Sequence, residues 1–317
     1  MLFLTILAGF AVQASLSSAP LVESSRPAIE KGILFVQNEG LRWKKEYDCA
    51  SCHHVPMAIW TLNEAKSFGF TINEVALTEM THWVLTEDDQ GKIIPADGRN
   101  QVTLAAAYTT LGVTAGNANP ALKAMTDHLV SQQGEDGSWT CLPEGIKPIL
   151  ADSVAGSLLT QIALRSAAFP ELEPAIAKAD AWLSAQPVPD DAQRRALILL
   201  LAARKGAEPA ALVPLMDAIV DHQNPDGGWS QAPEMPSDAY ATGQALYALA
   251  SARCGNRHPA SARAIAFLLQ TQREDGSWPM TSRPNETNGK PAINLTPITC
   301  AGSAWAVLGM LRGTSIP

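Results

Sequence analysis

The 317-residue sequence has no excess of basic residues: 23 Lys and Arg stand against 31 Asp and Glu, which gives a formal net charge of −8. Proteins that bind nucleic acid through its phosphates need a basic surface, so the composition argues against a nucleic-acid partner. Charged residues are also few overall, at 17% of the chain, whereas 46% of it is apolar. A chain of this length and composition can bury a large core and is not intrinsically disordered.

Beyond the N-terminus, the sequence has no run of apolar residues long enough to span a bilayer, which takes about 20 residues. The N-terminal run, Leu2–Val12, is shorter and is followed by small residues, with Val12 and Ala14 at positions −3 and −1 of a plausible cleavage point. This is the pattern of a secretory signal peptide, although no Lys or Arg precedes the run, and a membrane anchor is the alternative. We therefore predict a signal peptide at residues 1–19, an exported, periplasmic or otherwise extracytoplasmic protein, and no stable membrane span after cleavage.

Cysteine is scarce, with five residues in the chain, which is too few for a disulfide-dense scaffold. Cys141, Cys254 and Cys300 are scattered along the sequence, and three cysteines cannot all pair with one another. At least one of them is therefore expected to be a buried, small hydrophobic residue, while their pairing stays open. Cys49 and Cys52 differ from these, because they lie close together and next to two histidines.

Alternation of apolar and polar residues is not sustained anywhere, so β-strands are expected to be minor. What recurs instead is a phrase made of an apolar helix end, a Gln, then Asp-Gly and a Trp. Its three copies, HLVSQQGEDGSW, IVDHQNPDGGW and FLLQTQREDGSW, end at Trp139, Trp229 and Trp278. Asp-Gly favours a turn because Gly accepts a positive φ. The Trp after it is a large apolar anchor whose indole N–H needs a partner, so it is expected to pin the turn between two helices.

Each phrase lies between two kinds of helix. The segments after it are rich in Ala, Gly and Ser and almost uncharged, which indicates buried inner helices at 152–164, 238–250 and 298–311. The segments before it carry charge on one face and indicate outer helices, as at 120–132 and 259–270. Weaker copies fill the gaps and add inner helices at 55–65, 102–111 and 195–203.

The repeat therefore amounts to six outer–inner helix pairs at a spacing of roughly 40–50 residues. Six pairs with a fully buried inner set favour a closed ring, because an open stack would expose an inner face at each end. We predict a single all-α domain over residues 20–317, built as an (α/α)6 toroid, with the two neighbouring cysteines in its first repeat.

The phrase Gln-x-x-Asp-Gly-Ser-Trp resembles the QW repeat of squalene–hopene cyclases and the related repeat of protein prenyltransferases. Exported planctomycete-type repeat proteins with a Cys-x-x-Cys-His-His near the start are similar too. The resemblance covers nearly all of the mature chain and implies an α/α barrel with a cavity at the mouth of the inner helices. It implies no particular activity, because one fold hosts many chemistries.

The chemical motifs of those enzymes are not found. Squalene–hopene cyclases protonate an alkene with an Asp-x-Asp-Asp motif, and the nearest matches here, 188–191 and 86–89, lack its first Asp. Protein prenyltransferases hold zinc with Asp, Cys and His, and no Asp-x-Cys with a suitable His is present. Aromatic residues are only 6% of the chain, and the repeat accounts for many of them, which weakens the case for an aromatic-lined cavity. Whether the chain is an enzyme is therefore left open.

Asp152 and Asp238 stand at equivalent places, each opening a predicted inner helix. They are the candidate catalytic residues, because paired carboxylates at the barrel mouth suit acid–base chemistry. The alternative is that each is an N-cap, which is the position that Asp prefers at a helix start.

Cys49-Ala50-Ser51-Cys52-His53 is a Cys-x-x-Cys-His, the attachment sequence of c-type haem. The two thiols would bond to the porphyrin vinyl groups and His53 would be the axial ligand of the iron, while the sixth ligand cannot be read from the sequence. The alternatives are a disulfide or redox pair, a zinc site that includes His53 and His54, and an incidental match.

These observations lead to three hypotheses about function. The first is an exported toroid bearing haem c, used for electron transfer with a redox partner protein or for haem-linked binding or chemistry at the barrel mouth. The second is an enzyme like the squalene–hopene cyclases or prenyltransferases, acting on an apolar isoprenoid small molecule in the central cavity. The third is a non-catalytic interaction scaffold in which the cysteines are structural.

The haem hypothesis predicts a covalent adduct. When the full chain is exported together with a cytochrome c maturation system, we expect a pyridine haemochrome spectrum and an intact mass raised by one haem. The Cys49→Ser/Cys52→Ser variant should lose both signals. Apoprotein from a strain that loads a control cytochrome would exclude this hypothesis.

Overall fold

The computed structural model describes residues 18–47, 53–85, 102–115, 121–140, 149, 152–187, 191–252, 258–284 and 290–315. The regular structure of this part of the chain is α-helical, with one short 3-10 helix, η1 (Pro170–Leu172), and no strand beyond two isolated bridges. The predicted all-α fold is confirmed. Cys49, Cys52, Cys141 and Cys254 lie outside the described residues, as does all but the end of the predicted signal peptide.

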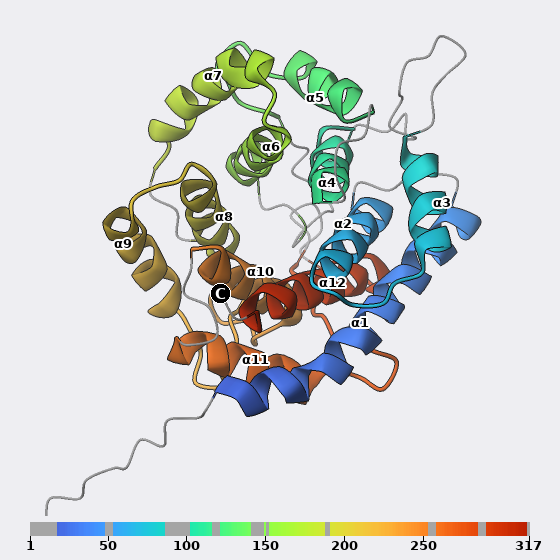
Figure 1. Ribbon diagram of the computed structural model, residues 1–317. Helices are drawn as coiled ribbons and strands as arrows, with labels where there is room; N and C mark the ends of the chain where they lie inside the picture. The colour runs from blue at the N-terminus through green and yellow to red at the C-terminus, as the bar shows by residue number, and fades with distance from the viewer. Residues whose placement is uncertain are drawn as a thin grey trace, which may run out of the picture.

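Twelve α-helices of the described residues alternate between two concentric rings (Figure 1). The outer ring contains α1 (Ser18–Glu46), α3 (Glu74–Val84), α5 (Ala121–Ser131), α7 (Glu173–Ser184), α9 (Pro209–Val220) and α11 (Pro259–Thr271). The inner ring contains α2 (His54–Ser67), α4 (Val102–Ala115), α6 (Ser153–Ala167), α8 (Ala192–Arg204), α10 (Ala239–Ser251) and α12 (Thr296–Gly313). α12 contacts both α10 and α2, so the inner ring closes and the predicted (α/α)6 toroid is confirmed.

The inner helices are buried because small residues let their backbones approach closely. Gly243 of α10 faces α12, where an added Cβ would lie 2.3 Å from the backbone carbon of Trp305. Gly309 of α12 faces back, at 2.6 Å from the backbone oxygen of Gly243. A larger side chain at either glycine would force the two helices apart, so the Ala- and Gly-rich composition sets the width of the ring.

The repeated phrase forms the turn between each outer helix and the inner helix after it. The indole N–H groups of Trp139, Trp229 and Trp278 donate to backbone carbonyls ten residues earlier, over 2.7, 2.8 and 2.7 Å. The backbone N–H of each Trp donates to a hydroxyl on the inner helix, from Ser157, Thr242 and Ser303. The predicted anchoring role of the three tryptophans is therefore confirmed.

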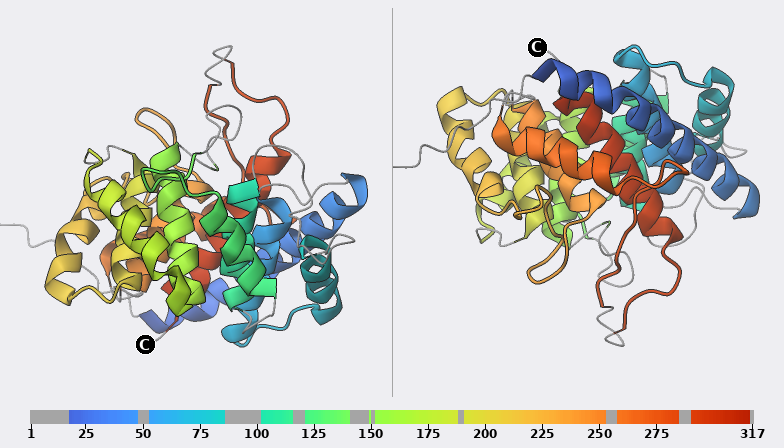
Figure 2. Two further views of the ribbon diagram at one scale, coloured as in Figure 1. Left: turned by 90° about the horizontal axis from the view of Figure 1, so that it is seen from above. Right: turned by 90° about the horizontal axis from the view of Figure 1, so that it is seen from below.

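The glutamine of the phrase joins one repeat to the next. The side-chain amides of Gln133 and Gln223 each donate to a carbonyl in their own turn and to one in the first turn of the next outer helix, at Ala175 and Ala260. In the last copy, Gln272 donates to Ala28 of α1, 2.8 Å away. The N-terminal helix is thereby the next outer helix after α11, and the two run side by side in Figure 2.

None of the helices in the described part of the chain is both long and apolar enough to cross a membrane.

The turn glycines provide a test of this packing. Gly227 has a φ of +91°, and a Cβ there would lie 2.7 Å from the backbone oxygen of Arg263 in α11. Gly206 has a similar φ of +70°, but a Cβ there would meet nothing within 4 Å. We expect Gly206→Ala to lower the free energy of unfolding by about 1 kcal/mol, from backbone strain alone.

Gly227→Ala should cost about 2 kcal/mol more, because α11 must also shift and the Gln223 hydrogen bonds weaken. Chemical denaturation of the two variants measures the difference. Equal losses would contradict the close helix approach.

Candidate functional site

The N-terminal ends of the inner helices bring several sequence-predicted residues to one end of the ring. The side-chain Oδ1 atoms of Asp152, Asp191 and Asp238 accept the backbone N–H three residues on, over 2.9, 3.0 and 2.9 Å, and so cap α6, α8 and α10. His53 occupies the same position before α2 without a side-chain cap bond. The N-cap interpretation of Asp152 and Asp238 is confirmed, and each stands at the start of its own inner helix.

The two candidate carboxyl groups differ in how deeply they are buried. The side chain of Asp152 is 32% exposed and forms an ion pair with Arg194. Asp238 is only 5% exposed, and its Oδ2 atom makes no hydrogen bond of good geometry with the described residues. Burial raises the pKa of Asp238 from 3.8 to about 6, against the opposing effect of the Ala241 N–H and the Gln231 side chain. Asp238 can therefore hold its proton closer to neutral pH than an ordinary carboxyl group does.

Arg283 places a positive charge beside this carboxyl group. Its guanidinium donates to the backbone oxygen of Gln231 at 2.9 Å and to Gln231 Oε1 at 3.3 Å. It also lies 3.8 Å from the carboxylate of Asp191. Gln231 is fixed in turn, because its Nε2 donates to the carbonyl of Thr281. The positive charge of Arg283 limits the rise in the pKa of Asp238.

Aromatic side chains from different inner helices meet inside the ring. Trp60 of α2, Tyr247 of α10 and Trp305 of α12 meet edge to face, with ring centroids 5.1–5.7 Å apart. Tyr240 contacts Trp305 at 6.4 Å and Tyr108 contacts Trp60 at 6.3 Å, and all five rings are fully buried. The low aromatic content weakened the case for an aromatic interior, but aromatic side chains that are distant in sequence gather there. Edge-to-face packing stabilises such a cluster and presents ring faces to neighbours.

At the other end of the inner helices lies a polar cluster that the sequence reasoning missed. Glu64 of α2 is buried and accepts hydrogen bonds from Trp60 Nε1, at 3.0 Å, and from the Tyr247 hydroxyl, at 2.6 Å. Arg312 of α12 donates to both of its carboxylate oxygens, at 2.9 and 3.0 Å, and borders a cavity of about 150 Å³ beside Arg204. Burial and the nearby Glu64 raise the pKa of Tyr247 well above its usual value. A single Glu within an otherwise uncharged stretch of inner helix was the available sequence signal.

His53 is enclosed where α2 meets α12. It is 4% exposed, and its Nε2 lies 3.1 Å from the backbone oxygen of Pro297. Burial and the neighbouring His54 lower its pKa from 6.5 to about 3. An iron bound through Nε2 would require the ring to turn away from Pro297. Since Cys49 and Cys52 lie outside the described residues, the haem site stays a prediction.

His54 packs against α1 instead. Its ring stacks on Trp43 with centroids 4.2 Å apart, and its Nε2 lies 3.8 Å from Glu39, which also pairs with Arg42. Among the described residues no group of three His, Cys, Asp or Glu side chains could hold a metal ion. Cys300, in α12, is a free and fully buried thiol, as expected for at least one of the scattered cysteines.

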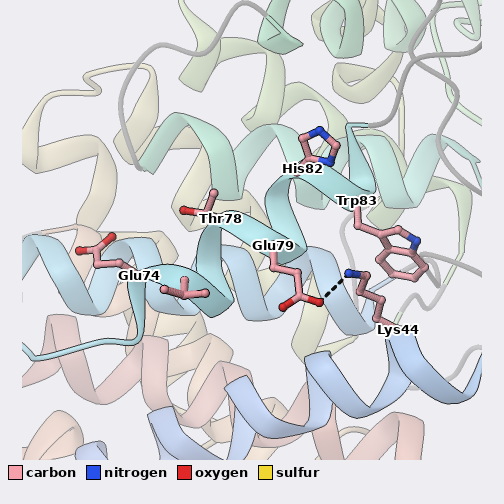
Figure 3. Close-up of a pocket in the computed structure, with 7 residues that line it drawn as sticks. Lys44, Glu74, Thr78, Glu79, His82 and Trp83 are labelled. Carbon is pink, nitrogen blue, oxygen red and sulfur yellow. Dashed lines mark hydrogen bonds and ion pairs between the residues drawn. The ribbon is translucent and has the colours of Figure 1, made fainter.

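A surface groove of about 620 Å³ lies elsewhere, on the outer helices α1 and α3 (Figure 3). Lys44 and Glu79 form an ion pair across it at 2.7 Å, and Val75, at 75% exposure, contributes to its apolar wall. None of Asp152, Asp238 and His53 lines this groove. The buried carboxyl group and the aromatic interior therefore remain the stronger candidate site.

Comparison with known proteins agrees with this architecture. Residues 190–316 match the family model of the squalene-hopene cyclase C-terminal domain. A drimenyl diphosphate synthase of Streptomyces showdoensis is 32% identical over 95 residues, which are 30% of this chain and 17% of that enzyme. The match thus spans about a sixth of that relative.

Two solved structures extend the likeness over the whole ring. The type II terpene cyclase MstE from Scytonema, in complex with merosterolic acid A, has a TM-score of 0.62 at 16% identity and covers 93% of this chain and 99% of its own. A glycosidase has a TM-score of 0.58 at 11% identity and covers 94% of this chain and 99% of its own. At such low sequence identity, the similarity shows a shared fold only. The glycosidase shows that proteins with this fold also carry out other chemistry.

The buried carboxyl group predicts a pH dependence of stability. The pKa of Asp238 is higher in the folded state than in the unfolded state, so protonation of this group contributes to the free energy of unfolding. The contribution is fully present below about pH 4 and is lost as the pH rises through 6. Asn keeps the cap but cannot ionise. The pKa difference corresponds to about 3 kcal/mol. The stability of Asp238→Asn relative to the wild type should therefore increase by about that much as the pH is raised from 4 to 7.

Denaturant unfolding at a series of pH values measures this difference. Asp152→Asn is the matched control, because it changes the equivalent but partly exposed cap. A constant difference between Asp238→Asn and the wild type across this pH range would contradict the buried, protonated carboxyl group.

Proposed function

We propose that this chain, which has the α/α toroid fold of the terpenoid cyclase superfamily, is an enzyme that acts on an apolar isoprenoid substrate in the barrel interior. Asp238 would be the proton donor, and the surrounding aromatic side chains would line the path of the substrate. The observation that carries the proposal is the buried carboxyl group of Asp238, which has one oxygen without a hydrogen bond among the described residues.

The proposed chemistry needs only a proton and an apolar, electron-rich surface. Asp238 would give its proton to one carbon of a carbon–carbon double bond, leaving a carbocation at the other. Ring closure would follow by attack of a second double bond, and loss of a proton would restore the acid. The faces of aromatic rings attract cations, and Trp60, Trp305 and Tyr240 provide such rings.

Two comparisons support this assignment. The family match at residues 190–316 includes Asp238, Tyr240 and Trp305. A structure of MstE in complex with its substrate geranylgeranyl dihydroxybenzoate covers 93% of this chain with a TM-score of 0.62, at 15% identity. This chain departs from the cyclase pattern of Asp-x-Asp-Asp, because Asp238 is preceded by Met235-Pro236-Ser237 and has no acidic residue within three positions before it. Its acid would therefore owe its protonation to burial.

Turnover tests the proposal directly. We expect the purified chain to convert an acyclic isoprenoid, with squalene and geranylgeraniol as probes, into cyclic products detected by gas chromatography and mass spectrometry. Asp238→Asn should lower the rate by at least about 100-fold, because removing a general acid typically costs 10²–10⁴.

Asp152→Asn is again the matched control and should retain near wild-type turnover, since Asp152 is partly exposed and is paired with Arg194. Equal losses in the two variants, or no cyclic product from the wild type, would overturn the proposal.

A covalent haem at Cys49 and Cys52, with His53 as its axial ligand, remains a second proposal, together with export and a redox partner protein. It is favoured by the position of His53, the residue before α2, at the same end of the ring as Asp238. Haem would supply one-electron chemistry there. The haemochrome and mass measurements described above test it independently of turnover.

A further inference from the structure

Gln244 is a buried amide inside the ring. It stands between Tyr240 and Tyr247 on one face of α10, because residues three and four apart lie together on a helix. Both of these tyrosines contact Trp305, so this face of the helix looks into the aromatic interior. The side chain of Gln244 is 3% exposed, and neither its Nε2 nor its Oε1 makes a hydrogen bond with the described residues.

Other buried glutamines on the inner helices are hydrogen-bonded. Gln161 of α6 donates to the Ile176 carbonyl and to Asp180, and Gln193 of α8 donates to the Ile149 carbonyl and to the Tyr240 hydroxyl. A buried amide without partners costs stability, while an apolar side chain of the same shape would not. A ligand that forms the missing hydrogen bonds would explain why a buried amide is present at this position.

We infer that Gln244 binds a hydroxyl group of an otherwise apolar ligand in the barrel interior. This inference rests on the proposed function and narrows its substrate class to isoprenoid alcohols. A primary amide offers both a donor and an acceptor, and a hydroxyl group offers both in return. The aromatic rings of Tyr240, Tyr247 and Trp305 suit the hydrocarbon chain on either side of that group.

A matched pair of ligands tests the inference: geranylgeraniol and its analogue in which hydrogen replaces the hydroxyl group. Binding to the full chain is followed by quenching of tryptophan fluorescence. We expect the wild type to bind the alcohol at least about tenfold more tightly, since the hydrocarbon leaves the amide unpaired. Gln244→Met keeps the length of the side chain and should abolish the preference while still binding the hydrocarbon.

Thermal unfolding without ligand separates this role from a structural one. Gln244→Met should leave Tm unchanged or raise it, because an unpaired buried amide is removed. The control Gln193→Met removes hydrogen bonds that the structure contains and should lower Tm.

The outcomes distinguish the two proposals. Equal affinities of the wild type for the two ligands, or a lowered Tm for Gln244→Met, would overturn this inference and leave the proposed enzyme standing. Binding of neither ligand to the wild type would overturn both.

Discussion

The hydrogen bonds of the repeated turn are the interaction on which the rest of this structure depends. In each of three turns a tryptophan is fixed to the outer helix before it and to the inner helix after it, and a glutamine reaches the next outer helix. These bonds set the position of one helix pair against the next. The last glutamine, Gln272, donates to Ala28 near the other end of the chain. The hydrogen bond that closes the ring is therefore the same kind of contact as the one that joins successive helix pairs.

A closed ring places equivalent residues of different repeats in different surroundings. The caps of α6 and α10 are both aspartates with the same backbone hydrogen bond, yet Asp152 is ion-paired at the surface and Asp238 is buried beside Gln231 and Arg283. The repeat thus provides several positions for one chemical group, and long-range packing decides which of them can hold a proton. A functional site can therefore arise in such a ring when the surroundings of one repeat differ from those of the others.

The interior shows the same division between scaffold and chemistry. The five aromatic side chains, the buried Glu64 with Arg312, and the unpaired amide of Gln244 lie on helices whose other buried residues are mostly apolar. A core built only for stability would favour apolar side chains at the positions of Glu64 and Gln244, because burying polar groups costs free energy. The likeness to both a terpene cyclase and a glycosidase shows that the ring itself does not select a reaction.

The helices, the turns, the caps and the number of helix pairs could be predicted from the sequence, because each depends on residues close together in the chain. Alanine-rich stretches, Asp-Gly turns and an Asp before a helix act locally, and α6, α8, α10 and α12 begin or end within a few residues of their predicted bounds. Only the tertiary structure decided which aspartate is buried, that Trp60 meets Trp305, and that Arg312 reaches Glu64 from the opposite end of the chain. These depend on contacts between distant segments, and burial, with the pKa that follows from it, exists only once the ring has closed.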